Sequence, residues 1–264
     1  MIYGGFFKLF IMKKTIILLF FLACSNSIAQ VRITYTVKIN YDENDDISTY
    51  EKSAIDNAKH LLFELIIDGD KANFFIVNTL TNDADIKGAD FARALTYKAR
   101  ESYYIDFKKK KYYYNIGRSP MQELNNFLIV GDMNKSWELT NESKLINNYK
   151  VIKAKGKTSE KKSDVANIEA PPKAFEIPIE AWYCPEINLP FGPIGMGDLP
   201  GLILELNYGK IKYTFHKIDF NYKMKKGIKV LNKGEEIDYN SYITIFTQKT
   251  LERIKELGIN LNKN

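Results

Sequence analysis

Strict alternation of apolar and polar residues is the feature that most constrains the fold of this chain. Residues 31–41 alternate at every position, with apolar side chains at the odd numbers and polar side chains at the even numbers. A period of two residues is that of a strand with one buried side, whereas a helix repeats every 3.6 residues. This run therefore predicts a strand at the start of the folded domain.

Three pairs of apolar runs are each joined by a short polar turn. The pairs are 61–67 with 72–77, 103–107 with 112–116, and 202–206 with 211–220. Apolar runs around turn residues are typical of β-hairpins. In the last run the alternation changes phase near His216 and Lys217, which predicts a β-bulge there.

Shorter runs predict further strands. They are residues 127–130, 136–139, 148–154 and the alternating run 175–183. Pro178 interrupts the last of these, and proline lacks the amide hydrogen that a central strand needs. We therefore expect Pro178 at an edge or a bulge.

Three stretches depart from the strand pattern. Residues 41–60 are polar and acidic and predict a loop with one helical turn. Residues 155–173 are rich in lysine, include Pro171-Pro172 and hold few apolar side chains, which predicts an exposed, mobile insertion. Residues 238–257 place apolar side chains three or four positions apart, which predicts a C-terminal amphipathic helix.

Consecutive strands joined by short turns indicate antiparallel pairing, because parallel strands need long crossovers. The expected fold class is mainly β: a single strongly curved antiparallel sheet, or partial barrel, with the C-terminal amphipathic helix. The sequence shows no internal repeat and no sign of a second domain. Residues 30–264 are predicted to form one domain.

Residues 1–29 have the composition of a signal peptide. Two lysines precede the apolar run 15–23, and Ser27-Ile28-Ala29 forms a small-residue cleavage site. The apolar run is shorter than the ~20 residues of a membrane-spanning helix. We expect cleavage after Ala29 and export; an alternative is lipidation of Cys24, which would anchor the mature N-terminus to a membrane.

Charge and cysteine content narrow the class of protein further. Removal of the leader takes three lysines with it and lowers the net charge from +6 to +3, too little to indicate a nucleic-acid-binding protein. Cys184 is the one cysteine outside the leader, so the domain has no internal disulfide and depends on its core. A buried apolar role for Cys184 is the main interpretation, with a nucleophile and an intermolecular disulfide as alternatives.

The segment 181–206 is dense in residues that set the backbone conformation. It contains four glycines, which reach angles closed to other residues, and four prolines, whose φ is fixed at about −65°. A long loop of this composition is stiff and keeps a fixed shape.

Several short motifs, taken in order along the chain, resemble the GLPGLI family. They are Trp137-Glu138-Leu139-Thr140, Glu142-Ser143-Lys144, Tyr149 to Ala154, Ala181-Trp182-Tyr183, Gly192-Pro193 and Leu199-Pro200-Gly201-Leu202-Ile203. The resemblance covers most of the chain after the leader. Two positions differ: Asp198 stands where the family motif begins with Gly, and Val151 stands where relatives often carry Cys.

The resemblance implies an exported protein of Gram-negative Bacteroidota with a β-rich fold and no established activity. It places the chain in the periplasm or on the periplasmic face of the outer membrane. It implies no catalytic residues, and Val151 argues against essential cysteine chemistry at that position.

The sequence offers little catalytic or metal-binding chemistry. His60 and His216 lie in no ligand-spaced cluster, and His216 falls on the polar side of its strand. Hydrolase and zinc-protease motifs are absent, and the glycine-rich segment lacks the Lys-Ser/Thr of a phosphate-binding loop. The carboxylate pairs that remain as an acid–base alternative are Glu180 with Glu186 and Asp198 with Glu205. We expect no catalytic residue, metal or cofactor.

The chain is rich in aromatic residues, with 17 tyrosines and 16 phenylalanines. They suit the pleated surface of a sheet, and the alternative is a sugar- or lipid-binding face. Tyr112 to Tyr114 beside Lys108 to Lys111 fit an edge hairpin, whose lysines oppose aggregation, better than a nucleic-acid patch.

The function we expect is a non-enzymatic envelope protein that binds an apolar or peptide ligand on the apolar face of its sheet, bordered by the stiff loop. One alternative is an interaction subunit that docks through that loop on an outer-membrane transporter or another envelope protein; an enzyme is the third. The candidate binding-loop residues are Trp182, Tyr183, Cys184, Gly192, Pro193, Leu199, Pro200 and Gly201.

Overall fold

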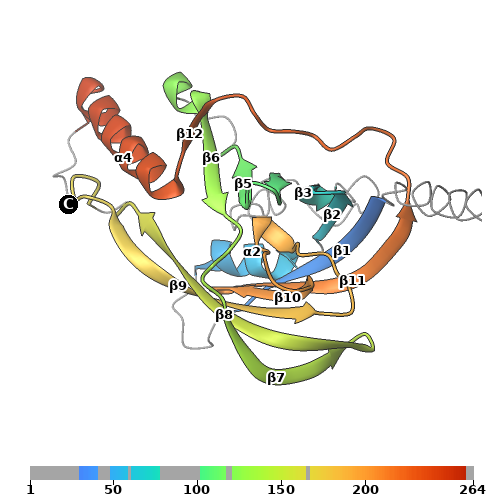
Figure 1. Ribbon diagram of the computed structural model, residues 1–264. Coiled ribbons are helices and arrows are strands. Elements are labelled where there is room, and N and C mark those ends of the chain that lie inside the picture. Colours follow the sequence, from blue (N-terminus) through green and yellow to red (C-terminus); the bar gives the residue numbers. More distant parts are fainter. Residues whose placement is uncertain are drawn as a thin grey trace, which may run out of the picture.

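A computed structural model describes residues 30–40, 48–58, 61–77, 102–116, 121–164 and 167–259, which form a twelve-stranded sheet with helices at its margins (Figure 1). The strands are β1 (Gln30–Ile39), β2 (Leu62–Asp68), β3 (Lys71–Val77), β4 (Tyr103–Asp106), β5 (Lys111–Tyr114), β6 (Phe127–Asp132), β7 (Glu138–Ile146), β8 (Tyr149–Lys162), β9 (Lys173–Cys184), β10 (Leu202–Tyr208), β11 (Ile211–Tyr222) and β12 (Glu235–Ile237). The helices are α2 (Thr49–Ala58) and α4 (Tyr239–Glu256), with 3-10 turns η2 (Gln122–Asn126) and η3 (Pro193–Gly195). The predicted leader, its Cys24 and His60 lie outside the described residues.

Pairing in the sheet is mostly antiparallel, as predicted. The order across the sheet is β12-β6-β5-β4-β3-β2-β1-β11-β10-β9-β8-β7, and β12 with β6 is the parallel pair. The three predicted hairpins correspond to β2–β3, β4–β5 and β10–β11. The mainly β class with a C-terminal helix is therefore confirmed. The prediction of an edge hairpin at β4–β5 is wrong, because β4 pairs with β3 and β5 pairs with β6.

The predicted strong curvature and partial barrel are wrong, because the sheet is neither closed nor strongly curled. Its two edges, β12 and β7, do not pair with each other. Helix α4 packs against β6 and β8, whereas β7 lies at the bottom of the view, away from the helix (Figure 1). Among the helices that the structure describes, none is long and apolar enough to cross a membrane.

The core lies mainly on one face of the sheet, here called the inner face. It centres on three fully buried rings: Phe63 stacks on Phe74 at 5.3 Å between ring centroids, and Tyr213 meets both edge-on at 5.5 and 5.7 Å. Aromatic pairs in these geometries add to the stability gained by burying their area. Tyr35, also fully buried, donates its hydroxyl to the Ile203 carbonyl at 2.7 Å, so its polar atom is satisfied.

Regular structure extends further than the sequence predicted in three places. The predicted single helical turn is the ten-residue helix α2. Residues 155–162 of the predicted insertion belong to β8, so among the described residues of that stretch irregular structure is confined to 163–164 and 167–172. Strand β7 runs from 138 to 146 rather than over 136–139. The strands in these regions alternate poorly because polar side chains are exposed along much of both faces.

Two local predictions in the strands agree with the structure. Thr34 pairs with Lys217 and Tyr35 with Phe215, which leaves His216 as the extra residue of a bulge. Pro178 lies one residue beyond the last pair of β9 with β10, Tyr208↔Ile179, so β9 has an open edge on that side.

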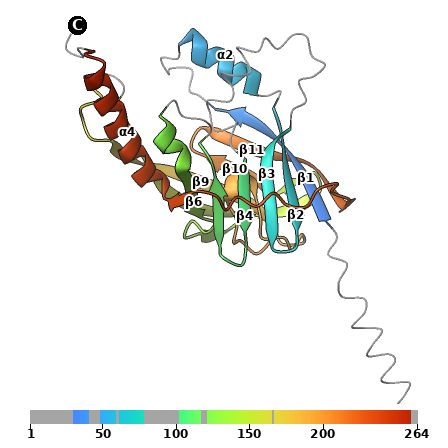
Figure 2. The ribbon, with the colours of Figure 1, turned by 90° about the horizontal axis from the view of Figure 1, so that it is seen from above.

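The connection of residues 223–234 crosses the face of the sheet opposite the inner face, here called the outer face (Figure 2). Side-chain amides of the sheet form hydrogen bonds to the backbone of this connection, as a neighbouring strand would. Asn73, itself buried, donates to the Lys229 carbonyl at 2.9 Å and accepts from the Lys229 amide at 2.7 Å. Gln30 accepts from the Met224 amide at 2.7 Å.

Asn240, in the first turn of α4, joins the helix to the sheet in the same way. Its side chain accepts from the Lys161 amide at 2.6 Å and donates to the Ser159 carbonyl at 2.9 Å. Strand β7 pairs only with residues 149–155 of β8, so the later part of β8 presents a free edge on this side. Asn240 satisfies two backbone groups of that edge.

We predict that Asn240→Ala lowers the free energy of unfolding by about 1–2 kcal/mol, because two backbone groups of β8 lose a partner close to solvent. Chemical denaturation measures the loss, and hydrogen exchange should become faster at the Lys161 amide. Asn141→Ala, at an exposed position of β7, is the control and should change stability little. Unchanged exchange at Lys161 would show that α4 is held without this contact.

Candidate functional site

The glycine- and proline-rich loop of residues 185–201 packs onto the inner face of the sheet. Phe191, Ile194 and Met196 are each at most 3% exposed. The ring of Phe191 lies 5.7 Å from that of Phe107, and η3 contacts β3, β4 and β5. The loop therefore fills the apolar face that it was expected to border.

Two glycines make this close approach possible. Gly195 has φ +79°, and a Cβ there would lie 2.3 Å from Cγ of Tyr112. Gly201 has φ +151°, and a Cβ there would lie 2.1 Å from the Cys184 carbonyl oxygen. Both positions combine a backbone angle that favours glycine with the absence of space for a side chain.

Hydrogen bonds fix the loop on two sides. Trp137 donates its indole N–H to the Gly197 carbonyl at 2.8 Å, and the Gly197 amide donates to the Met133 carbonyl at 3.2 Å. On the side of β10, the Ile203 amide donates to the Phe191 carbonyl at 3.0 Å. Trp137 and the loop are thus parts of one packing unit, although they lie some sixty residues apart in sequence.

Asp198 adopts the left-handed conformation, with φ +63°. This is a conformation that glycine reaches freely and that Asp tolerates better than most residues. The Asp198 carboxylate accepts from Asn134 at 2.9 Å and pairs with Lys110, and these contacts hold its pKa below the usual value although burial opposes the shift. Asp198 therefore fits at the position where the related motif begins with Gly.

Most of the predicted binding-loop residues are buried. Tyr183, Cys184, Gly192, Pro193, Leu199 and Gly201 are buried, as is the greater part of Trp182, and Pro200 is exposed. A fully buried thiol at Cys184 agrees with its predicted apolar role.

Trp182 lies on the opposite face of the sheet, within a network of charges. The ammonium groups of Lys144 and Lys153 lie 4.1 and 5.3 Å from its ring centroid. Glu180 accepts from the Trp182 indole and pairs with Lys153 at 2.9 Å, while nearly buried Glu205 pairs with Lys144 and with a lysine of β11. Glu180 and Glu205, one from each predicted acid–base pair, are thus engaged in structural ion pairs.

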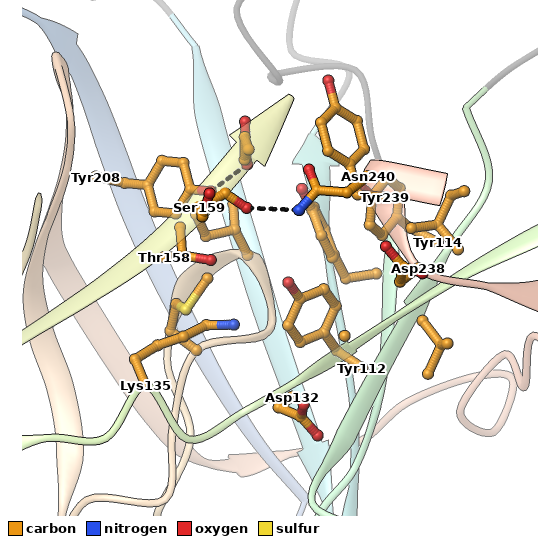
Figure 3. A pocket seen from close by; sticks show the side chains of 17 residues that line it. Tyr112, Tyr114, Asp132, Lys135, Thr158, Ser159, Tyr208, Asp238, Tyr239 and Asn240 are labelled. Carbon is orange, nitrogen blue, oxygen red and sulfur yellow. Dashed lines mark hydrogen bonds between the residues drawn. The ribbon is translucent and has the colours of Figure 1, made fainter. Parts of the chain in front are cut away.

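A pocket of about 270 Å³ remains at the margin of the inner face (Figure 3). Its walls come from β4 to β6, from β8, from η3 and from the first residues of α4. The tyrosines that line it are Tyr103, Tyr112, Tyr114, Tyr208 and Tyr239. Their side chains surround the pocket with aromatic faces and hydroxyl groups, an amphipathic lining.

Strand pairing brings three of these tyrosines together. Tyr103 pairs with Tyr114 across β4 and β5, and Tyr112 lies two residues away on the same side. Ring centroids are 5.0 Å apart for Tyr103–Tyr114, 5.8 Å for Tyr103–Tyr112 and 6.2 Å for Tyr112–Tyr114. They form one continuous aromatic wall, here called the tyrosine wall, and the cavity that it borders is called the tyrosine pocket.

The opposite wall carries a hydrogen-bonded pair. Tyr208 of β10 donates its hydroxyl to Glu160 of β8. Burial, and secondly the nearby Glu160 carboxylate, raise the pKa of Tyr208 above its usual value. The Tyr208 hydroxyl is therefore a stable hydrogen-bond donor, not a source of a phenolate.

Charged groups surround the rest of the pocket. Three carboxylates, Asp132, Glu160 and Asp238, line it together with one ammonium group, Lys135. The Lys135 ammonium lies 5.2 Å from the ring centroid of Tyr112 (Figure 3). Asp238 accepts from the hydroxyl and from the amide of Ser241 at the start of α4, and these bonds, the hydroxyl first, hold the pKa of Asp238 below its usual value although burial opposes the shift.

Sequence reasoning did not find this pocket. The i, i+2 spacing of Tyr112 and Tyr114 was the available signal, because it places both rings on one side of a strand. The facing wall includes Thr158 to Glu160, in the stretch predicted to be an insertion. Nothing local in the sequence indicates that these segments face each other.

The described part of the chain contains no group of three or more His, Cys, Asp and Glu side chains placed to hold a metal ion. His216 is exposed, as predicted.

Comparison with known proteins supplies a partial assignment. Residues 137–205 are similar to a family described as a protein of unknown function, Porph_ging. The match spans Trp137, β8, β9 and the loop, and so includes the packing unit described above. A comparison with curated proteins found no match.

Among solved structures, two of PNGF-II are similar at low identity. The structure in space group C2 is 18% identical with a TM-score of 0.42, over 84% of this chain and 33% of the other. The P21 structure is also 18% identical with a TM-score of 0.42, over 83% and 34%. This chain spans about a third of the length of those proteins, and the likeness carries no argument about function.

We predict that Gly195→Ala lowers the free energy of unfolding by about 2–5 kcal/mol, the sum of left-handed strain and overpacking against Tyr112. Thermal or chemical denaturation measures it. Gly227→Ala is the matched control, because a Cβ there meets no atom within 4 Å. Equal stability of the two variants would contradict the packing of the loop onto the tyrosine wall.

Proposed function

We propose that this protein is an exported, non-catalytic binding module of the cell envelope, and that its ligand is a peptide whose anchoring side chain enters the tyrosine pocket. The observation that carries the proposal is that the chain's own loop covers the inner face and leaves this lined pocket at its margin. An extended apolar ligand on the face itself would compete with Phe191, Ile194 and Met196.

The composition of the pocket favours a peptide. Tyrosine offers a large, rigid and amphipathic surface at low entropic cost, which is why it is enriched where proteins recognise proteins. The volume of about 270 Å³ is slightly below the ~300 Å³ at which small-molecule sites begin, and so suits one side chain of a longer ligand.

A non-catalytic role agrees with the use of the candidate acids. Glu180 and Glu205 are held by lysines on the outer face, and Asp198 by Lys110 and Asn134. Groups held in this way stabilise the fold and are poorly suited to accept protons.

We further propose that the chain is a GLPGLI-family protein with a leader cleaved after Ala29, located in the periplasm or on the periplasmic face of the outer membrane. Leu199-Pro200-Gly201-Leu202-Ile203 falls within the matched segment 137–205, and a glycine-compatible φ at Asp198 supports the alignment of the motif.

Thr158→Phe tests the pocket. Thr158 lies on β8 with its side chain lining the pocket, so a phenyl ring there should occupy the space without removing a core contact. We predict that the variant loses most of the peptide binding of the native protein, measured by native mass spectrometry against a pool of random hexapeptides. Lys157→Phe, the neighbouring position on the outer face, should retain it. Failure of the native protein to retain any peptide would overturn the proposal.

Docking on another envelope protein is a second candidate, favoured by a shallow groove at the far end of the loop. Phe107, Leu189, Pro190, Leu199 and Pro200 line it together with the turn between β2 and β3. The groove is continuous with the exposed Pro200. An outer-membrane transporter is the type of partner that the alternative predicts.

We predict that Pro200→Glu reduces recovery of such a partner from envelope extracts severalfold, because a carboxylate would be desolvated at an apolar contact. Quantitative pull-down measures the recovery. Pro171→Glu, exposed in the β8–β9 connection, is the control. Equal recovery with both variants would argue against docking through the loop.

A further inference from the structure

We infer that the anchoring side chain of the peptide is an arginine. The inference rests on the proposed function and adds the chemical class that the tyrosine pocket selects. It is carried by the combination of aromatic faces and carboxylates around one small cavity.

The charge balance of the lining favours a cation. Asp132, Glu160 and Asp238 contribute three carboxylates, and Lys135 contributes one ammonium group. Asp132 also pairs with the ammonium of Lys111 at 2.6 Å, which leaves an excess of one negative charge around the pocket. A small concave site lined with an excess of one charge concentrates its field inside the cavity. An apolar side chain placed there would desolvate carboxylates without compensation, which is costly.

The aromatic wall favours a cation as well. The face of a tyrosine ring carries negative potential and attracts ammonium or guanidinium groups within about 6 Å of its centroid. Lys135 already places its ammonium 5.2 Å from the Tyr112 centroid. The chain's own lysine thus uses part of the surface that a ligand cation would use, and its charge opposes entry of a second cation.

Glu160 supplies an acceptor opposite the rings. Its Oε1 accepts from the Tyr208 hydroxyl, and the carboxylate lines the pocket. Since Glu160 is half-buried, a charge-assisted bond to it is stronger than one at the surface.

Arginine fits this arrangement better than lysine. Its planar guanidinium stacks on aromatic rings and binds a carboxylate through two parallel N–H groups. Tyr208, which donates to Glu160, lies across the pocket from Tyr112 and Tyr114 (Figure 3), so a long side chain in the cavity can reach both the rings and the carboxylate. A compact ammonium can also make both contacts, as Lys144 does with Trp182 and Glu205, but it lacks the flat face and the two parallel N–H groups of a guanidinium.

The probes are four capped pentapeptides, Gly-Gly-X-Gly-Gly, in which X is arginine, lysine, leucine or citrulline. Citrulline is the neutral isostere of arginine and isolates the effect of charge. Isothermal titration calorimetry on the purified protein measures each dissociation constant. The arginine peptide should bind about tenfold more tightly than the citrulline peptide, as expected for a charge-assisted bond.

Two variants should act in opposite directions. Glu160→Gln keeps an acceptor for Tyr208 but removes the charge, and should weaken arginine binding by about tenfold. Lys135→Met removes the competing ammonium and should strengthen it severalfold. Glu176→Gln, on β9 of the same hairpin, and Lys150→Met, at an exposed position of β8, are the matched controls and should bind as the native protein does.

The outcomes distinguish the arginine inference from the proposed peptide binding. Equal binding of the arginine and citrulline peptides, or arginine binding unchanged in Glu160→Gln, overturns the arginine inference while peptide binding itself stands. Lysine equal to arginine also overturns it. If neither these peptides nor the hexapeptide pool binds, the proposed function fails together with the inference. Melting temperatures of the variants close to the native value exclude a loss caused by misfolding.

Discussion

The burial of the loop of residues 185–201 against the inner face is the constraint on which the rest of the structure depends. An open sheet with one strongly apolar face needs a cover, and here the cover is a connection between neighbouring strands of the sheet itself. The cover can approach closely because Gly195 leaves no atom where a Cβ would collide with Tyr112. A rigid cover of fixed shape also fixes the size of the pocket beside it.

The open form of the sheet creates a second requirement, which side-chain amides meet. Unpaired strand edges and crossing connections leave backbone groups without partners. Asn240 satisfies the free edge of β8, and Asn73 holds the connection that crosses the outer face. Each amide donates one hydrogen bond to the segment it holds and accepts one from it, as a residue of a neighbouring strand would. The C-terminal helix is therefore attached to the sheet by polar contacts as well as by packing.

Much of the fold could be predicted from the sequence, because its signals are local. The alternation of β1, the turns of three hairpins, the bulge at His216 and the period of α4 each depend on neighbouring residues. Whether the sheet closes could not be predicted from such local signals, since it depends on how distant segments, among them α4, pack. The site was missed for a similar reason: Tyr112 and Glu160 lie about fifty residues apart and face each other only after the hairpins have assembled. The loop was predicted to be stiff, but local sequence does not reveal which face such a loop covers.

The origin of the pocket walls bears on what relatives of this chain share. The matched segment 137–205 contains β8, β9 and the loop, and thus the cover and one wall of the pocket. Tyr112, Tyr114, Lys135 and Asp238 lie outside that segment. Similarity over residues 137–205 therefore accounts for how the inner face is covered but does not determine the charges and rings at its margin. A protein that keeps the cover and changes β5 or the start of α4 would keep the fold and have a pocket with different charges and rings.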